Sequence, residues 1–323
     1  MKKTKWGVAL ATVAVVAAAV AQGAGEAPAA ELKPALVVSH AVQAGQLAVA
    51  RAGKRLVSVG DHGVILTSDD EGQHWKQADQ VPFDGLLNGV SFADEQHGWA
   101  VGHAGVILHT ADAGRTWTLQ RSDTATDRPL FAVQFFDAEH GVAVGLWSLV
   151  LVTEDGGKTW AEQKLAPPEG ARKADLNLLG LFTNAKGEVF AAAERGTVLR
   201  SADRGHTWTY LPTGYTGSFW CGVALPDGTL LAGGLRGSLF RSEDDGSTWQ
   251  RIETRTTSSI TALAVHGEQH VTGVGADGLV LQSNDGGRTF APQVRDDRRP
   301  LTALAPVAGQ KTLLLSRGGP LAP

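Results

Sequence analysis

Short apolar runs, separated by glycine and small polar residues, follow one another along most of the chain. Between residues 87 and 120, four such runs are rich in β-branched and aromatic residues. This pattern is typical of antiparallel strands joined by tight turns. No window after residue 30 has a convincing helical periodicity, so the sequence predicts an all-β protein. The four runs are residues 87–93, 98–102, 106–110 and 116–120.

One eight-residue pattern, Ser/Thr-x-Asp-x-Gly-x-Thr-Trp (the box), recurs every 41 to 48 residues. Its first residue is the last residue of the third run of each unit. A period of this size marks repeated supersecondary units. The first copy has His74 in place of Thr, and the last has Phe290 in place of Trp. The copies are residues 68–75, 110–117, 153–160, 201–208, 242–249 and 283–290. Their aspartates are Asp70, Asp112, Asp155, Asp203, Asp244 and Asp285.

A second marker precedes each box: a small residue eight positions before it and usually a glycine five positions before it. We interpret the pair as the tight turn between the second and third strands, where glycine can take a positive φ. The third unit departs from this pattern, with Leu146 and Trp147 inside the turn. The pairs are Gly60/Gly63, Gly102/Gly105, Gly145/Ser148, Ala193/Gly196, Gly234/Gly237 and Gly275/Gly278.

After the sixth box the chain begins a seventh unit. Residues 301–307 match a first strand, residues 311–315 match a second, and residues 316–319 occupy the turn position. We expect the apolar stretch at residues 35–39 to complete this unit. The predicted fold is an all-β, seven-bladed β-propeller of four-stranded antiparallel blades, whose last blade is closed by N- and C-terminal strands. Six complete blades followed by an unpaired tail is the alternative.

The N-terminus has the features of an export signal. Three lysines among the first five residues precede an apolar run at residues 6–21 and several small residues. We expect a signal peptide at residues 1–29, cleaved after Ala21 or Ala29, and one propeller domain at residues 30–323 in the periplasm or outside the cell. The apolar run would span about 24 Å as a helix, less than the ~30 Å of a hydrocarbon core. A retained membrane anchor is the alternative.

Composition excludes several classes of function. With 29 basic and 33 acidic residues and a net charge of −4, the chain has no global footprint for nucleic acid or anionic lipid. The single cysteine, Cys221, excludes an intramolecular disulfide framework and lies among apolar residues, as an inert core thiol does. We expect a monomer without a cofactor.

The boxes resemble metal sites, but we expect them to be structural. A calcium ion needs six to eight converging oxygen ligands, whereas each box offers one reliable carboxylate. Ser/Thr and Asp side chains can instead bond turn amides, glycine can take the strained position, and Trp can pack on apolar surface. His62 and His103 fall in corresponding turns, but two histidines are only part of a zinc shell. We expect no metal site.

The repeat resembles the Asp-box, or bacterial neuraminidase, repeat of sialidases, other glycosidases and non-enzymatic propellers. The longer unit, with Gly-Trp-Ala-Val-Gly-x-x-Gly-x-Ile at residues 98–107, more closely resembles the photosystem II stability and assembly factor propellers. This resemblance covers nearly all of the mature chain. It implies a seven-bladed, lumenal or periplasmic, non-enzymatic protein that helps membrane-protein complexes to form. Related sequences occur in bacteria without photosystems, so the resemblance does not identify the client.

The alternative function is that of a sialidase-like or other glycoside hydrolase. A sialidase-like site needs an arginine cluster and a Tyr nucleophile paired with Glu, and other glycosidases use two carboxylates. Of the two tyrosines, Tyr210 follows a box Trp on an outer strand, whereas Tyr215 lies in a loop that could reach the face. Asp61, Glu194 and Asp277 lie in strand-two-to-three turns, but no spacing pairs them. We therefore expect no catalytic residues.

In a propeller, the strand-two-to-three turns and the connections between blades share one face, opposite the boxes. Arginines are frequent in these loops although the chain is net acidic, and acidic residues accompany them. Arginine and large aromatic residues are favoured at interfaces, so we expect this face to bind an exported or membrane protein client. Ordinary solvated loops are the alternative. The candidate residues are Arg128, Arg195, Arg236, Arg255, Arg298, Tyr215 and Trp220.

Overall fold

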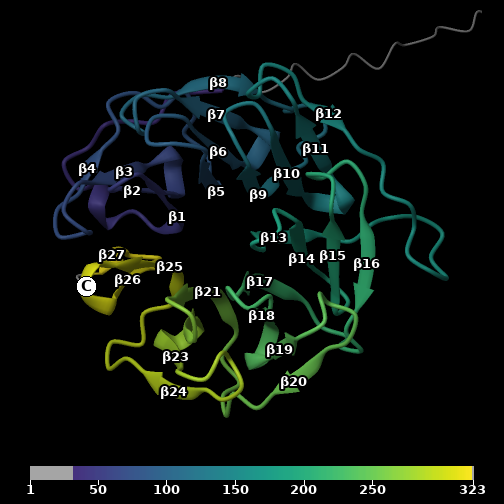
Figure 1. Cartoon of the computed structure of the whole chain (residues 1–323). Coiled ribbons are helices and arrows are strands. Elements are labelled where there is room, and N and C mark those ends of the chain that lie inside the picture. Colours follow the sequence, from purple (N-terminus) through teal and green to yellow (C-terminus); the bar gives the residue numbers. More distant parts are fainter. Residues whose placement is uncertain (1–31, 322–323) are drawn as a thin grey trace, which may run out of the picture.

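A computed structural model describes residues 32–321, and Figure 1 shows seven antiparallel sheets arranged around a central axis. The only helical segments in this part of the chain are three-residue 3-10 turns. None of them is long and apolar enough to cross a bilayer. The expected signal peptide, residues 1–29, lies outside the described residues. The all-β, seven-bladed prediction is confirmed.

Each sheet is one blade, and its strands follow the chain from the axis outwards. Blade 1 contains β1 (Gln46–Ala52), β2 (Arg55–Gly60), β3 (Ile65–Ser68) and β4 (Lys76–Gln77). Blade 2 contains β5 (Leu87–Phe92), β6 (Gly98–Gly102), β7 (Ile107–Thr110) and β8 (Thr118–Arg121). Blade 3 contains β9 (Leu130–Phe135), β10 (Gly141–Gly145), β11 (Val150–Thr153) and β12 (Ala161–Glu162). Blade 4 contains β13 (Leu178–Thr183), β14 (Val189–Ala193), β15 (Thr197–Ser201) and β16 (Thr209–Pro212).

The remaining blades follow in the same direction around the axis (Figure 1). Blade 5 contains β17 (Phe219–Ala224), β18 (Leu230–Gly234), β19 (Leu239–Ser242) and β20 (Gln250–Ile252). Blade 6 contains β21 (Ile260–His266), β22 (His270–Gly275), β23 (Leu279–Ser283) and β24 (Ala291–Val294). Blade 7 contains β25 (Leu301–Val307), β26 (Lys311–Ser316) and β27 (Gly319–Leu321).

The core lies between the blades. Every residue of β6, β10, β14 and β18 is buried, because each of these second strands has a neighbouring blade on both sides. Clusters of buried side chains therefore combine adjacent blades. In one of them, Val57 of blade 1 packs with Leu108 and Trp117 of blade 2. Strands buried on both faces read as continuous apolar runs, which is the pattern in the sequence.

The turn between the second and third strands explains the small-residue marker, for two different reasons. The second residue of the pair takes a positive φ, as predicted: φ is +65° at Gly63. The first residue is extended, with φ of −173° at Gly60. It must be small because a Cβ at Gly60 would lie 1.9 Å from the carbonyl oxygen of Gly45. These turns include η2 (Asp61–Gly63), η3 (His103–Gly105), η4 (Leu146–Ser148), η5 (Leu235–Gly237) and η6 (Ala276–Gly278).

The last blade is closed differently from the prediction. Within residues 32–321, its sheet has three strands in the order β25-β26-β27, and all three come from the C-terminal part of the chain. The N-terminal segment meets this blade through η1 (Ala41–Gln43), which contacts β27 without joining the sheet. Gly319 comes so close to Val42 that a Cβ would lie 1.9 Å from the Val42 carbonyl oxygen. Within residues 32–321, the predicted donor, residues 35–39, does not join this sheet, so that part of the prediction is wrong.

The predicted donor segment, residues 35–39, lies beside blade 1 instead. The backbone N–H of Ala35 donates to the Val81 carbonyl at 3.0 Å. The side-chain amide of Gln77 accepts from the Val38 N–H at 2.9 Å and donates to the Leu36 carbonyl at 2.8 Å. These backbone groups are thus bonded within blade 1, and the segment does not extend blade 7.

Packing of blade 7 against blade 1 closes the ring. Leu56 of β2 lies in one buried cluster with Leu313 and Leu315 of β26. Two hydrogen bonds cross the same boundary: the Thr302 hydroxyl donates to the Gln46 carbonyl, and Arg51 donates to the Pro306 carbonyl at 2.8 Å. Closure therefore rests mainly on apolar contact and not on a shared sheet.

Cys221 lies in β17 with its sulfur 3.6 Å from the Gly233 carbonyl oxygen. Burial raises the pKa of the Cys221 thiol to about 12. Since the thiolate is the reactive form, this shift disfavours thiol chemistry at Cys221, in line with the inert role expected from the sequence.

Replacing Leu313 with alanine is expected to lower the free energy of unfolding by about 2–5 kcal/mol, because truncating a buried leucine leaves a cavity. Leu313 is fully buried beside Gly72 of blade 1. Urea unfolding measures the change. In the control Leu119→Ala, the leucine of β8 is exposed, and the change should stay below about 0.5 kcal/mol. Equal losses in both variants would contradict closure by this packing.

Candidate protein-binding face

The six boxes use their polar groups within their own turns. In the third box, Thr153 donates its hydroxyl to Asp155 Oδ1 at 2.9 Å and accepts the Gly157 N–H at 2.8 Å. Asp155 Oδ1 also accepts the Thr159 N–H at 2.9 Å, and Oδ2 accepts the Thr159 hydroxyl at 2.6 Å. The other five boxes have equivalent contacts, with the His74 ring in place of the hydroxyl in the first.

These contacts make each box carboxylate a structural acceptor. The hydroxyl and backbone N–H of Thr159 are the main reasons why the pKa of Asp155 falls from 3.8 to about 2. Asp285 also has a pKa of about 2: burial opposes the shift, but donors including Thr289 outweigh it. Within residues 32–321, no group of three or more His, Cys, Asp or Glu side chains is arranged to hold a metal ion.

Each box also lies against the preceding blade. A Cβ at Gly114 in the second box would lie 3.1 Å from Val57 of blade 1, and one at Gly205 in the fourth would lie 2.7 Å from Val142 of blade 3. The box Trp fixes this glycine, because the Trp117 indole N–H donates to the Gly114 carbonyl at 3.0 Å. The box glycines thus let neighbouring blades approach closely.

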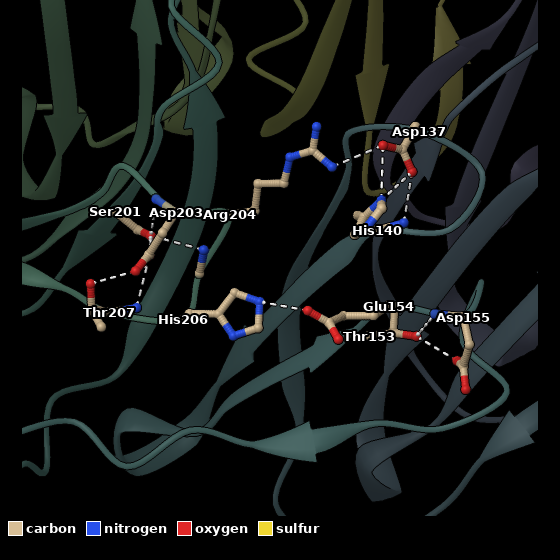
Figure 2. A network of polar contacts seen from close by, with 11 residues as sticks. Asp137, His140, Thr153, Glu154, Asp155, Ser201, Asp203, Arg204, His206 and Thr207 are labelled. Atoms are coloured by element: carbon tan, nitrogen blue, oxygen red, sulfur yellow. Dashed lines mark hydrogen bonds and ion pairs between the residues drawn. The ribbon is translucent and has the colours of Figure 1, made fainter.

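Polar contacts on the box side join blades 3 and 4 (Figure 2). Arg204 of the fourth box pairs with Asp137 at 2.9 Å, and His206 lies 3.3 Å from Glu154 of the third box. The side chains of this face are therefore bonded across the boundary between blades, which leaves the opposite face as the better candidate for a partner.

The opposite face is formed by the strand-two-to-three turns and the connections between blades (the turn face). In blades 1 to 6, each turn is hydrogen-bonded to the connection that leads into the next blade, so the two sets of loops lie side by side, as predicted. In blade 5 the Thr254 hydroxyl donates to the Gly237 carbonyl at 2.7 Å. The other five turns use backbone pairs: Gly63–Gly85 at 2.7 Å, Asp123–Ala104 at 2.7 Å, Ser148–Leu176 at 2.6 Å, Gly196–Gly217 at 2.6 Å and Arg295–Gly278 at 3.0 Å.

Four of the five candidate arginines are exposed on the turn face. Arg195 and Arg236 are the tips of the turns in blades 4 and 5, and Arg255 and Arg298 lie in connections. Arg195 pairs with Asp175 at 3.0 Å. Among residues 32–321, no carboxylate oxygen lies within 4.0 Å of the guanidinium nitrogens of the other three. These three cations are therefore available to an acidic partner.

The fifth arginine, Arg128, differs in its surroundings. It forms a two-pronged ion pair with Glu162 of β12, at 3.0 and 2.8 Å, and its side chain is largely buried. Its guanidinium is thus engaged within blade 3.

Tyr215 supports the turn face from beneath. Its hydroxyl donates to the Leu235 carbonyl at 3.1 Å, and its ring packs 5.3 Å from the Phe219 ring and 5.4 Å from the Phe240 ring. It therefore holds the turn of blade 5 in place, and it is only half-exposed.

Trp220 belongs to a ring of seven residues around the axis. In every blade the second residue of the innermost strand is a β-bulge, which leaves it without a partner in the second strand. A bulge redirects its side chain, and here all seven line a cavity of about 370 Å³ together with Arg317. The ring consists of Leu47, Asn88, Phe131, Leu179, Trp220, Thr261 and Thr302.

The polar members of this ring are bonded to the next blade. The Asn88 amide donates to the Leu130 carbonyl at 2.8 Å, and the Thr261 hydroxyl donates to the Leu301 carbonyl at 2.8 Å. The apolar members are concentrated in blades 3 to 5, where Phe131, Leu179 and Trp220 are adjacent in the ring. The wall of this cavity is thus apolar on the side of blades 3 to 5.

The residues considered for hydrolase chemistry do not form a site. Tyr210 lies on the outer strand β16 and donates its hydroxyl to the Ala166 carbonyl at 2.9 Å. Glu194 accepts from Asn177. The remaining carboxylates, Asp61 and Asp277, lie in the turns of blades 1 and 6, and His62 and His103 in those of blades 1 and 2. The three carboxylates are thus distributed around the ring and are not paired.

Two features of the turn face were not predicted from the sequence. One is the ring of bulged residues, because no single residue type is common to its seven positions. The other is Trp147, which is 61% exposed and lines a cavity. Its signal was present: it occupies the one turn that departs from the repeat.

Comparison with known families identifies this chain. Residues 47–120, 77–167 and 118–216 match the family model described as photosynthesis system II assembly factor YCF48. Together these matches span residues 47–216, which is more than half of the chain. The chain belongs to this family. The assignment favours the assembly-factor interpretation over the sialidase-like alternative.

Solved structures of YCF48 proteins have the same fold. A structure described as YCF48 bound to D1 peptide is 19% identical, with a TM-score of 0.71, over 90% of this chain and 95% of that one. YCF48 from Cyanidioschyzon merolae is 17% identical, with a TM-score of 0.69, over 90% and 97%. At these identities the likeness concerns the fold. No curated protein matches the chain.

Asp155→Asn is expected to destabilise the protein by about 1 kcal/mol at pH 7, because the amide cannot accept both donors of Thr159. The carboxylate has a folded-state pKa of about 2, below its ordinary 3.8. Its contribution is therefore present above about pH 4 and lost as the pH falls to about 2. Urea unfolding at pH 7, 4 and 2 should show the gap between variant and wild type closing with acid.

Glu169→Gln is the matched control, because Glu169 is an exposed carboxylate in a connection. It should leave stability unchanged, within about 0.5 kcal/mol, at every pH. A gap for Asp155→Asn that is as large at pH 2 as at pH 7 would show that its carboxylate is not the stabilising group.

Proposed function

We propose that this protein is an exported, non-catalytic propeller that binds a segment of a membrane protein through its turn face and assists the assembly of that protein's complex. The family match carries this proposal, because it spans three of the seven blades completely and belongs to an assembly factor. The placement in the periplasm or outside the cell rests on the predicted signal peptide at residues 1–29.

The charge distribution on the turn face supports a protein client with acidic side chains. Arg236, Arg255 and Arg298 are exposed and have no carboxylate of the described chain within ion-pair distance. A guanidinium forms planar, two-pronged hydrogen bonds with carboxylates. An acidic client segment would therefore compensate cations that the propeller leaves open.

The client is proposed by analogy with the solved relative. That protein is described as bound to a D1 peptide, and a D1-type segment or an equivalent segment of another membrane protein is the corresponding client here. The proposal includes no enzymatic step. Asp61, Glu194 and Asp277 lie in separate blades, and the box carboxylates are bonded within their turns.

Simultaneous charge reversal of Arg195, Arg236 and Arg255 to Glu should weaken binding of a labelled D1-derived peptide by at least about tenfold. Fluorescence anisotropy at fixed salt measures this change. The matched control reverses Lys54, Lys76 and Lys158, three exposed lysines outside the turn face, and should leave affinity unchanged. An equal loss of affinity in both triple variants would show that the effect comes from net charge and not from the turn face.

A panel of chromogenic glycosides and sialosides tests the enzymatic alternative. The proposal expects no turnover above that of a boiled sample. Turnover that disappears in Glu194→Gln or Asp277→Asn would overturn the non-catalytic assignment.

A further inference from the structure

Among the Phe, Trp and Tyr side chains of residues 32–321, Trp147 is the only exposed one. It is the tip of the turn in blade 3, with φ of +53°, and Ser148 follows it with φ of +57°. Non-glycine residues are uncommon in this region, and bulky ones are outliers there. The corresponding tip in blade 2 is Ala104, so the turn itself does not require a large side chain.

The backbone around Trp147 is held rigidly. Its N–H donates to Asn177 Oδ1 at 3.1 Å, the preceding N–H of Leu146 donates to Pro129 at 3.1 Å, and the following N–H of Ser148 donates to Leu176 at 2.6 Å. Three successive amides are thus bonded to the connections that lead into blades 3 and 4. The indole is presented on a fixed support, which limits the entropy lost when a partner covers it.

The left-handed backbone is common to all six turn tips, so it does not distinguish Trp147 from the others. The exposed indole does distinguish it. The large apolar side chains of the second strands are buried between blades, whereas the Trp147 indole is 61% exposed and is not packed in this way. Contact with a partner would bury it.

A cavity of about 560 Å³ lies beside the indole. The long connection from blade 3 to blade 4 supplies Lys173, Ala174, Asp175 and Asn177, and the turn of blade 4 supplies Glu194 and Arg195. This is the connection whose extra residues give the largest step between boxes, so the cavity wall is specific to this part of the ring.

Most polar groups of the cavity are already bonded to one another. Asn177 donates to both oxygens of Glu194, at 3.0 and 3.1 Å, and Arg195 pairs with Asp175 at 3.0 Å. The indole face offers apolar contact, and Lys173, which has no carboxylate within 4.0 Å in the described chain, offers a charge at the rim.

We propose that this cavity, the Trp147 pocket, receives one large apolar side chain of the client, with acidic residues beside it facing Lys173 and Arg195. The inference rests on the proposed function, since it adds an apolar anchor to the client-binding face. A buried aromatic anchor with a polar rim is the usual arrangement of an interface hot spot.

Labelled peptides of the form Glu-Ser-Glu-X-Glu-Ser-Glu, with X as Phe, Leu or Ala, test the pocket directly by fluorescence anisotropy. The Phe and Leu peptides should bind about tenfold to hundredfold more tightly than the Ala peptide, as the burial of one such side chain implies. Trp147→Ala should remove this difference and leave the affinity of the Ala peptide unchanged.

Two further variants separate binding from folding. Trp147→Gly places glycine where φ is positive, so the melting temperature should stay the same or rise while discrimination among peptides is lost. Ala104→Trp puts an indole on the equivalent tip of blade 2, which lacks the pocket, and should leave discrimination unchanged. A melting temperature lowered by several degrees in both Trp147 variants would assign the side chain to packing and overturn the inference.

The remaining outcomes also decide the question. Arginine-dependent binding without discrimination among Phe, Leu and Ala peptides would preserve the proposed function and overturn the pocket. Absence of binding of any peptide at about 1 mM would overturn it as well. Binding of chitohexaose or maltohexaose that depends on Trp147 would assign the pocket to a carbohydrate instead.

Discussion

Each blade of this propeller has two apolar faces, and a blade cannot bury both of them alone. The second strands show the consequence, because every residue of β10 and β18 is buried between neighbouring blades. The stabilising contacts therefore belong to pairs of blades, as in other repeat architectures. This requirement makes ring closure a matter of packing: blade 7 has three strands in residues 32–321 and still buries Leu313 and Leu315 against Leu56 of blade 1.

Because of the same requirement, the two faces of the ring have different roles. On the box side, carboxylates are bonded to their own turns and glycines such as Gly205 let the blades approach, so substitutions there would disturb the ring. On the turn side, five of the six tips are exposed, and only Ala104 packs against a core cluster. The six tips are His62, Ala104, Trp147, Arg195, Arg236 and Asp277.

The repeat made the fold predictable because spacing and burial follow from the same unit. Blade number, strand order and the structural nature of the boxes follow from six copies with one register. The closing strand was not predictable, because an apolar segment such as residues 35–39 can pack without joining a sheet. Here the Gln77 side chain bonds its backbone, a contact that no sequence pattern announces. The candidate face was predicted as a set of loops, but the environments of Arg128 and Tyr215 depend on Glu162 and Leu235, which are distant in sequence.

A single small residue per blade connects the bulge ring to the turn tips. Gly234 pairs with Phe219, and a Cβ there would lie 2.1 Å from the Ser218 carbonyl oxygen. Because Gly234 has no Cβ, the innermost strand comes close to it, and the residue after Phe219, Trp220, forms the bulge. Beyond Gly234 the chain turns and places Arg236 at the tip.

In blades 3 to 5 the packing leaves two side chains per blade open, one in the ring of bulged residues and one on the turn face. In blades 3 to 5 the inner positions are Phe131, Leu179 and Trp220, and the outer positions are Trp147, Arg195 and Arg236. Apolar and cationic side chains thus lie on the same three blades. An acidic segment with a large apolar side chain would find both kinds of contact there, which favours these blades over the rest of the ring for the proposed client.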